Sequence, residues 1–153
     1  MDVEIDERKL EIQLRFPNLA LPDFDITSDI DYCYNCFAWA GGFADLNMQP
    51  STNPIYGWLT GEIGEALDNF EKQFEYLGYK EKTHTAEYEE GFDKIAFYVK
   101  GVEVQHASRQ LENGWWTTKL GPKEDITHKT LEGLEGEEYG KVGMILKRVK
   151  KVI

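Results

Sequence analysis

The sequence predicts an α+β fold in which helices pack on an antiparallel sheet. Helical segments come first and a run of strands joined by short turns follows, an order that differs from the alternation of a parallel sheet. The length of 153 residues suits a single domain, 1–153. Hydrophobic residues make up 41% of the chain, with 4 Trp, 8 Tyr and 8 Phe, which is enough for a packed core and argues against disorder.

The first 60 residues carry weak signals. Apolar side chains alternate over residues 10–14, which predicts a short strand, with a helix as the alternative. Pro17, Pro22 and the polar run 23–31 predict a loop. Residues 50–57 contain two prolines and a glycine and predict another loop.

Two helices are predicted. A short buried helix is expected over Phe37–Ala40, capped by Asn35. A longer one is expected over 61–77, because its apolar residues recur at helical spacing on one stripe. Thr60 suits the cap of this second helix and Gly78 suits its end.

A three-stranded meander is predicted over 94–120. Lys100 and Gly101 suit a two-residue turn, and Asn113 and Gly114 give the strongest hairpin signal in the chain. With these turns Ile95 faces residue 106, and residues 104, 106 and 108 share one face of the sheet.

The last 30 residues complete the sheet. Residues 127–134 predict a short helix, with Asp125 or Thr127 as its cap, and KVGMILKRV over 141–149 predicts the last strand.

The charge excludes several classes of function. The formal charge of −11 and a pI near 4.7 disfavour nucleic acid and anionic membrane surfaces as partners. The acidic N-terminus lacks the basic start and apolar stretch of a secretory signal, and the longest uncharged run, 37–44, is too short to span a bilayer. We therefore expect a cytoplasmic protein with reduced thiols.

Cys36 is the candidate nucleophile. The predicted helix places it in the first turn, where unpaired N–H groups and the helix dipole favour a thiolate and an oxyanion. A buried inert thiol is the alternative interpretation.

His106 and Asp125 are the candidate partners of Cys36. His106 is predicted to face the core and the Cys36 helix, where an imidazole takes up a thiol proton near neutral pH. Asp125 is the nearest acid that a turn would fold back to orient His106. A structural histidine and a helix-capping aspartate remain the alternatives.

The chain resembles a known family. Its YNCFAWA, HASRQLENGWWTTKLGPKEDITH and LEGLEGEEYGKV blocks are similar to those of uncharacterised bacterial proteins classed as a domain of unknown function, a family without an established activity. The order of parts is more distantly similar to papain-like cysteine hydrolases, in which a nucleophilic cysteine begins a helix and a general-base histidine follows on an antiparallel strand. Cys36 and His106 match that order.

The leading hypothesis is a papain-like cysteine hydrolase or acyltransferase that acts on a peptide, isopeptide or amide bond without a cofactor. The rival is a non-catalytic module that binds a protein. Cys33 and Cys36 also form a C-x-x-C, as in redox pairs, but the preceding segment predicts a loop rather than a strand. The three histidines lack metal-ligand spacing, which disfavours zinc.

Overall fold

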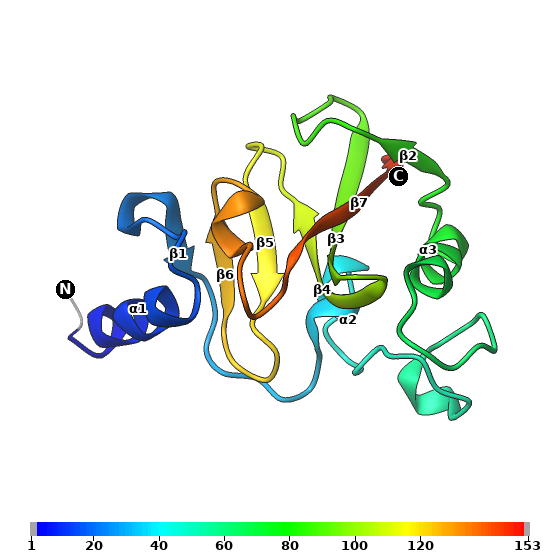
Figure 1. Ribbon diagram of the computed structural model, residues 1–153, viewed down its shortest axis with the longest axis horizontal. Helices are drawn as coiled ribbons and strands as arrows, with labels where there is room; N and C mark the ends of the chain where they lie inside the picture. Colours follow the sequence, from blue (N-terminus) through cyan, green and yellow to red (C-terminus); the bar gives the residue numbers. More distant parts are fainter. Residues whose placement is uncertain (1–2, 152–153) are drawn as a thin grey trace.

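The computed structural model describes residues 3–151, which form one seven-stranded antiparallel sheet with helices packed around it (Figure 1). The strand order is β1-β6-β5-β4-β3-β7-β2. The strands are β1 (Phe24–Ile26), β2 (Glu81–Thr83), β3 (Phe92–Lys100), β4 (Glu103–Gln110), β5 (Trp116–Lys119), β6 (Asp125–His128) and β7 (Lys141–Val149). The predicted α+β class, the meander and the last strand are confirmed.

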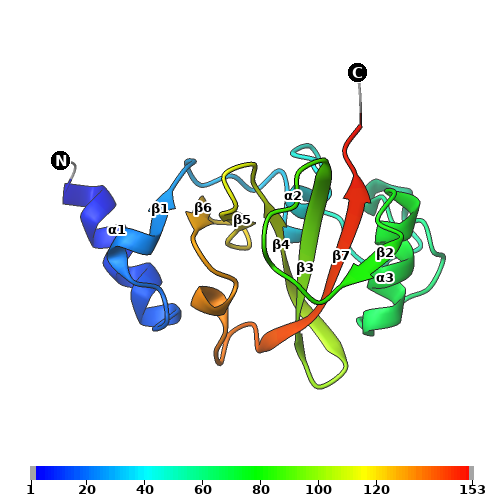
Figure 2. The same ribbon diagram turned by 90° about the horizontal axis from the view of Figure 1, so that it is seen from above.

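Three α-helices lie in the described chain: α1 (Val3–Arg15), α2 (Cys36–Ala40) and α3 (Leu67–Tyr76). Short 3-10 turns are η1 (Leu21–Asp23), η2 (Pro54–Tyr56) and η3 (Glu132–Leu134). In both ribbon views α1 lies beyond β1 at one end of the sheet, and α3 lies beside β2 at the other (Figures 1 and 2).

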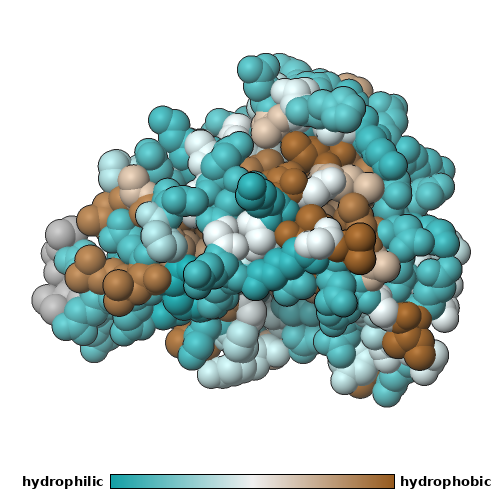
Figure 3. Space-filling view, viewed as in Figure 1, coloured by the Kyte–Doolittle hydropathy of each residue, from teal (hydrophilic) through white to brown (hydrophobic). Residues whose placement is uncertain are grey.

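The predicted strand at 10–14 is wrong, because this segment belongs to α1. Ile12 and Phe16, four residues apart, are buried in the core, whereas Leu10 and Leu14 are exposed. The apparent alternation is therefore two helical stripes of opposite exposure. The exposed stripe forms an apolar patch over α1 in the surface view (Figure 3).

The predicted helix at 61–77 begins later than expected. Gly61 and Gly64 have φ angles of 75° and 129°, which an α-helix does not use, so α3 begins only at Leu67. The predicted end is confirmed, because the helix stops before Gly78, whose φ is 98°.

The predicted helix at 127–134 is also wrong. β6 occupies its first part and pairs with β5 on one side and β1 on the other, while only Glu132–Leu134 turn as a 3-10 helix. The short β1 falls within a predicted loop. Pairing between distant segments satisfies the backbone of both strands, and local patterns do not reveal such pairing.

The register of the β3–β4 hairpin differs from the prediction. Its turn residues are Gly101 and Val102, because Lys100 pairs with Glu103. A further register shift follows, so that Tyr98, rather than Ile95, lies opposite His106. This bulge reverses the inward and outward alternation of β4.

The β4–β5 turn is one residue longer than predicted. Leu111 N–H donates to the Trp115 carbonyl at 2.7 Å, which leaves residues 112–114 as the loop. Gly114 takes a φ of 89° there, a conformation that favours glycine. Arg109 consequently pairs with Thr117.

The sheet has two covered faces with separate cores. We call one the α2 face; from β3 and β4 it carries Ile95, Phe97, Ala107 and Arg109. We call the other the histidine face; from the same strands it carries Ala96, Tyr98, His106 and Ser108. In Figure 2, α2 and η3 lie on opposite sides of the strands.

Candidate functional site

Cys36 is the first residue of α2, as predicted. Asn35 caps the helix, since its Oδ1 accepts from the Ala38 N–H at 3.0 Å. The thiol is buried. Burial raises the pKa of Cys36 to about 12, although the backbone N–H groups of Ala107, Phe37 and Cys36 itself act to lower it. Cys36 is therefore a protonated thiol surrounded by anion-stabilising donors.

His106 lies on the histidine face. Its ring stacks on Tyr139 with centroids 3.9 Å apart and planes 4° from parallel. Its Nε2 lies 3.5 Å from Thr118 Oγ1, and Nδ1 makes no hydrogen bond within the described residues. Burial lowers the pKa of His106 well below 6.5, and His128 lowers it further, so the imidazole is neutral.

Thr118 joins His106 to a second buried histidine. Its Oγ1 lies 2.7 Å from His128 Nε2 and 2.6 Å from Ser108 Oγ. His128 Nδ1 lies 2.9 Å from the Thr130 carbonyl, which only accepts, so Nδ1 carries the proton and Nε2 accepts from Thr118.

This chain of hydrogen bonds fixes the tautomer of His106. Thr118 has one hydroxyl proton, which goes to His128, so it accepts from its other neighbours. His106 then carries its proton on Nε2, and Nδ1 keeps a free lone pair. Such a lone pair is what a general base needs.

The relation of Cys36 to His106 depends on a split in the sheet. β4 and β5 form ladder pairs only at Arg109 and Gln110, and α2 contacts both strands. The Ala107 N–H is directed to Cys36, and the thiol helps to raise the pKa of Tyr139, mainly raised by burial. Tyr139 is the ring stacked on His106, and a thiolate at Cys36 would act on it.

The prediction that His106 faces the α2 helix is wrong. Among the described residues no hydrogen bond joins Cys36 to His106. The bulge in β4 is the physical reason, because it turns the imidazole to the face opposite α2. Arg109 takes the inward place instead, with its charge over the Trp39 ring.

A groove lies directly beside this split. Its volume is about 530 Å³. Its lining includes Asn35 and Phe37, which flank Cys36, and Val104 and Gln105, which precede His106. Gln49, Pro50 and residues 63–65 form other parts of the wall.

Asp125 lies away from His106. Its Oδ2 accepts from the Tyr34 hydroxyl at 2.8 Å, and its Oδ1 is buried without a partner. It pairs across the ladder with Lys119, on the α2 face. Burial raises the pKa of Asp125, outweighing the hydrogen bond from Tyr34. Thr118, rather than Asp125, therefore contacts His106.

Sequence reasoning missed Thr118 and Tyr139. A three-residue turn at 112–114 would have placed Thr118 beside Ser108, so the loop length was the missing signal. Tyr139 comes from the segment between η3 and β7, and no local pattern connects it to the strand that it covers.

Two further findings concern the described residues. Residues 3–151 contain no group of three or more His, Cys, Asp or Glu side chains arranged to hold a metal ion. No helix within that range is long and apolar enough to cross a membrane.

Comparison with known proteins gives a family. The family described as Domain of unknown function (DUF7689) matches residues 25–147, which is most of the chain. The chain belongs to this family. The matched range contains β2 to β6, α2, α3 and most of β1 and β7, and hence Cys36 and His106. No curated protein and no solved structure matches the chain.

Proposed function

We propose that the chain is a papain-like cysteine hydrolase or acyltransferase in which Cys36 is the nucleophile and His106 the base. The groove of about 530 Å³ carries the proposal, because residues on both sides of Cys36 and just before His106 line it. An acyl group in this groove would contact the chain neighbours of Cys36 and the residue before His106. The substrate is a peptide, isopeptide or amide, and the reaction needs no cofactor.

The proposed reaction begins with proton transfer. His106 Nδ1 takes the Cys36 proton, and the thiolate attacks the substrate carbonyl carbon to form a tetrahedral oxyanion. The unpaired N–H groups at the start of α2 stabilise that oxyanion. The imidazolium then protonates the departing amine, which leaves a thioester on Cys36.

Water or an amine completes the cycle. His106 accepts a proton from the attacking water, and collapse of the second tetrahedral intermediate releases a carboxylic acid and the thiol. An attacking amine gives a new amide, which is acyl transfer. The Thr118–His128 chain contacts the imidazole at Nε2, which leaves Nδ1 to accept and return the proton in each step.

The buried thiol corresponds to the proposed enzyme before a substrate binds. Cys36 is protonated and buried, and the His106 imidazole lies on the face opposite α2, so the reaction requires a rearrangement that brings Nδ1 to the thiol. Hydrogen bonds of catalytic groups are often long before a substrate binds. Both Cys33 and Cys36 are free thiols in the structure. A reducing compartment such as the cytoplasm would keep them in this form.

Acetylation by p-nitrophenyl acetate tests the proposal. In a Cys33→Ser background we expect one acetyl group on Cys36, removed by neutral hydroxylamine, and steady release of p-nitrophenol. Cys36→Ala should abolish both signals, and Gln105→Trp should slow them by filling the groove. Equal p-nitrophenol release from the Cys36→Ala protein would overturn the assignment.

A non-catalytic protein-binding module is the second candidate. The burial that raises the pKa of Cys36 to about 12 favours it, because a buried neutral thiol is unreactive. In that case Cys33→Ser, Cys36→Ala and His106→Gln all leave the rate of p-nitrophenyl acetate hydrolysis unchanged.

A further inference from the structure

A second pocket lies at the end of the sheet where β3 begins and where β4 and β7 end. Its volume is about 330 Å³. Four cationic side chains line it, Arg109, Arg148, Lys150 and Lys151, together with two carboxylates. The chain as a whole carries a charge of −11, so this local excess of positive charge is unusual for the molecule.

The two carboxylates already have partners. Asp93 Oδ2 lies 3.2 Å from Arg148 Nε, across the β3–β7 ladder. Glu112 lies 3.6 Å from Lys150 Nζ. Within the described chain Arg109 has no ion pair, because the two acids pair with Arg148 and Lys150.

Arg109 is half-buried and has few polar contacts. Its guanidinium lies 5.2 Å from the centroid of the Trp39 ring, and its Nε donates to the Trp39 carbonyl at 3.3 Å. No hydrogen bond within residues 3–151 uses the two terminal nitrogens. A guanidinium has five N–H donors in a planar fork, which matches the two oxygens of a carboxylate or phosphate.

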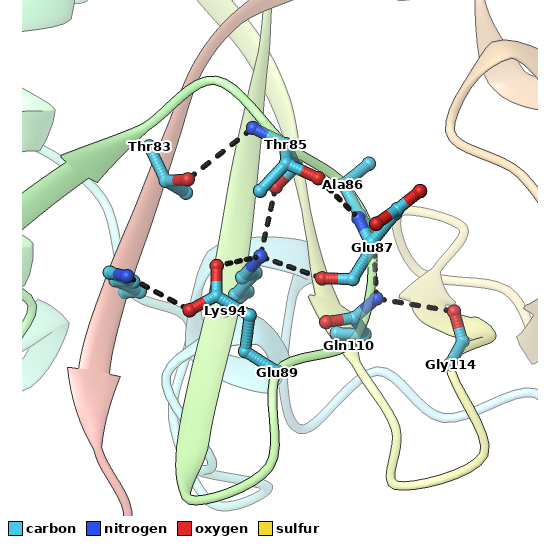
Figure 4. Close-up of polar contacts among 9 residues, drawn as sticks. Thr83, Thr85, Ala86, Glu87, Glu89, Lys94, Gln110 and Gly114 are labelled. Carbon is cyan, nitrogen blue, oxygen red and sulfur yellow. Dashed lines mark hydrogen bonds and ion pairs between the residues drawn. The ribbon is translucent and has the colours of Figure 1, made fainter.

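The buried lysines provide an internal comparison. Lys94 donates to the carbonyls of Thr85 and Glu87 and forms an ion pair with Glu89, which holds the 84–91 loop on β3 (Figure 4). Lys119 donates to three carbonyls in the same manner. The fold therefore satisfies its two buried lysines from within, whereas the half-buried Arg109 keeps its terminal nitrogens open to the pocket.

Two buried polar atoms near this end of the sheet have no partner: Gln110 Oε1 on the histidine face and Tyr79 OH on the α2 face. Gln110 lines the pocket, and its Nε2 is held by the carbonyls of Ala86 and Gly114, which leaves Oε1 buried without a partner (Figure 4). Tyr79 OH is likewise buried and unpartnered, with Arg148 4.4 Å from its ring centroid. Buried polar atoms without partners are uncommon and point to a missing ligand or water.

We propose that this pocket binds a small anionic group, a carboxylate or a phosphate, held by the fork of Arg109. Arg148 and Lys150 add positive charge. The site is separate from the groove beside Cys36, because Arg109 contacts the last part of α2 whereas Cys36 begins that helix.

Titration with three anions tests the site. The probes are inorganic phosphate, N-acetylglycine and acetate at constant ionic strength, and the readout is the Trp39 indole cross-peak in ¹H–¹⁵N NMR spectra. We expect saturable shifts in the low millimolar range or below, because each anion presents two oxygens to the Arg109 fork. The tighter of phosphate and N-acetylglycine identifies the source of the anion.

Variants separate a specific site from general charge. Arg109→Gln should weaken binding at least about tenfold, since it removes a charged two-point contact. Lys150→Gln should weaken anion binding a few fold. This variant tests the site even if the Arg109 variant fails to fold. Arg15 forms an ion pair with Glu138 and does not line this pocket, so Arg15→Gln is the control and should leave binding unchanged. Equal weakening by all three variants, or no saturation by any probe, would overturn the proposal.

Discussion

The two faces of one sheet differ in what stabilises them. The α2 face has an aromatic cluster in which Phe97 packs edge-on against Phe70 and Phe74. The ring centroids lie 6.0 and 5.0 Å from that of Phe97. The histidine face has a chain of hydrogen bonds through Thr118. The same strands supply both faces. Which side chains enter which core is decided by single-residue changes of register, such as the bulge before His106.

The largest expected effect lies on the α2 face. Phe97→Ala removes a fully buried ring that two other rings contact, so unfolding free energy should fall by about 3–5 kcal/mol. Urea denaturation measures this as a lower midpoint with an unchanged slope. Phe43→Ala, at a partly exposed ring, is the control and should cost less than about 1 kcal/mol. Similar losses for both would contradict an aromatic core on this face.

The histidine face should give the fold an acid-sensitive stability. Burial lowers the pKa of His128 from 6.5 to about 4. Between pH 6.5 and about 4, His128 binds a proton in the unfolded chain but not in the folded chain. The free energy of unfolding therefore decreases as the pH is lowered through this range. The contribution lost between pH 6.5 and 4 is on the order of 3 kcal/mol.

Denaturation of His128→Gln across this range measures the effect. The variant is less stable at pH 7, but its stability should decline less between pH 6.5 and 4. Parallel pH profiles for the two proteins would show that His128 is not the titrating group. His84→Gln, at an exposed histidine, serves as the control.

Removing the central hydroxyl should give an intermediate effect. Thr118→Val keeps the shape of the side chain but leaves His128 Nε2 and Ser108 Oγ without their partner. We expect a loss of about 2 kcal/mol by thermal or urea unfolding. Thr117→Val, one residue earlier and on the α2 face, breaks only the Trp39 indole bond and should cost about 1 kcal/mol. The reverse order would contradict a cooperative chain on the histidine face.

The smallest predicted effect lies at the α2 cap. Asn35→Ala removes the acceptor for the Ala38 and Met48 N–H groups, so stability should fall by about 1 kcal/mol. Asn35→Asp retains the acceptor and should recover most of the loss in urea denaturation. No difference between Ala and Asp at this position would show that the cap does not stabilise α2.

Local chemistry made parts of the fold predictable. Asn35 caps α2 and Gly78 follows α3, since capping depends on residues close in sequence. The strands of the meander were likewise evident from their β-branched and aromatic residues. β1 and β6 were not, because they pair across about 100 residues and only tertiary contacts select them.

The candidate site was predictable only in part. The helix-start position of Cys36 followed from its cap. The environment of His106 depended on the position of the β3–β4 turn, on the bulge after it and on the length of the β4–β5 turn, and all three differed from the prediction. The same change of register turns Arg109 toward α2. Its guanidinium lies over Trp39 and opens into a pocket, which lessens the cost of the missing partner.

The most direct test of the account is whether Cys36 and His106 act together across the split sheet. Alkylation of Cys36 by iodoacetamide, followed by intact mass from pH 6 to 10 in a Cys33→Ser background, measures thiolate formation. The account predicts that His106→Gln slows alkylation at least about tenfold near pH 7.5, where a base assists, and that His84→Gln does not. Unchanged alkylation in a His106→Gln protein with a lower Tm would instead make His106 a structural residue and contradict the catalytic pair.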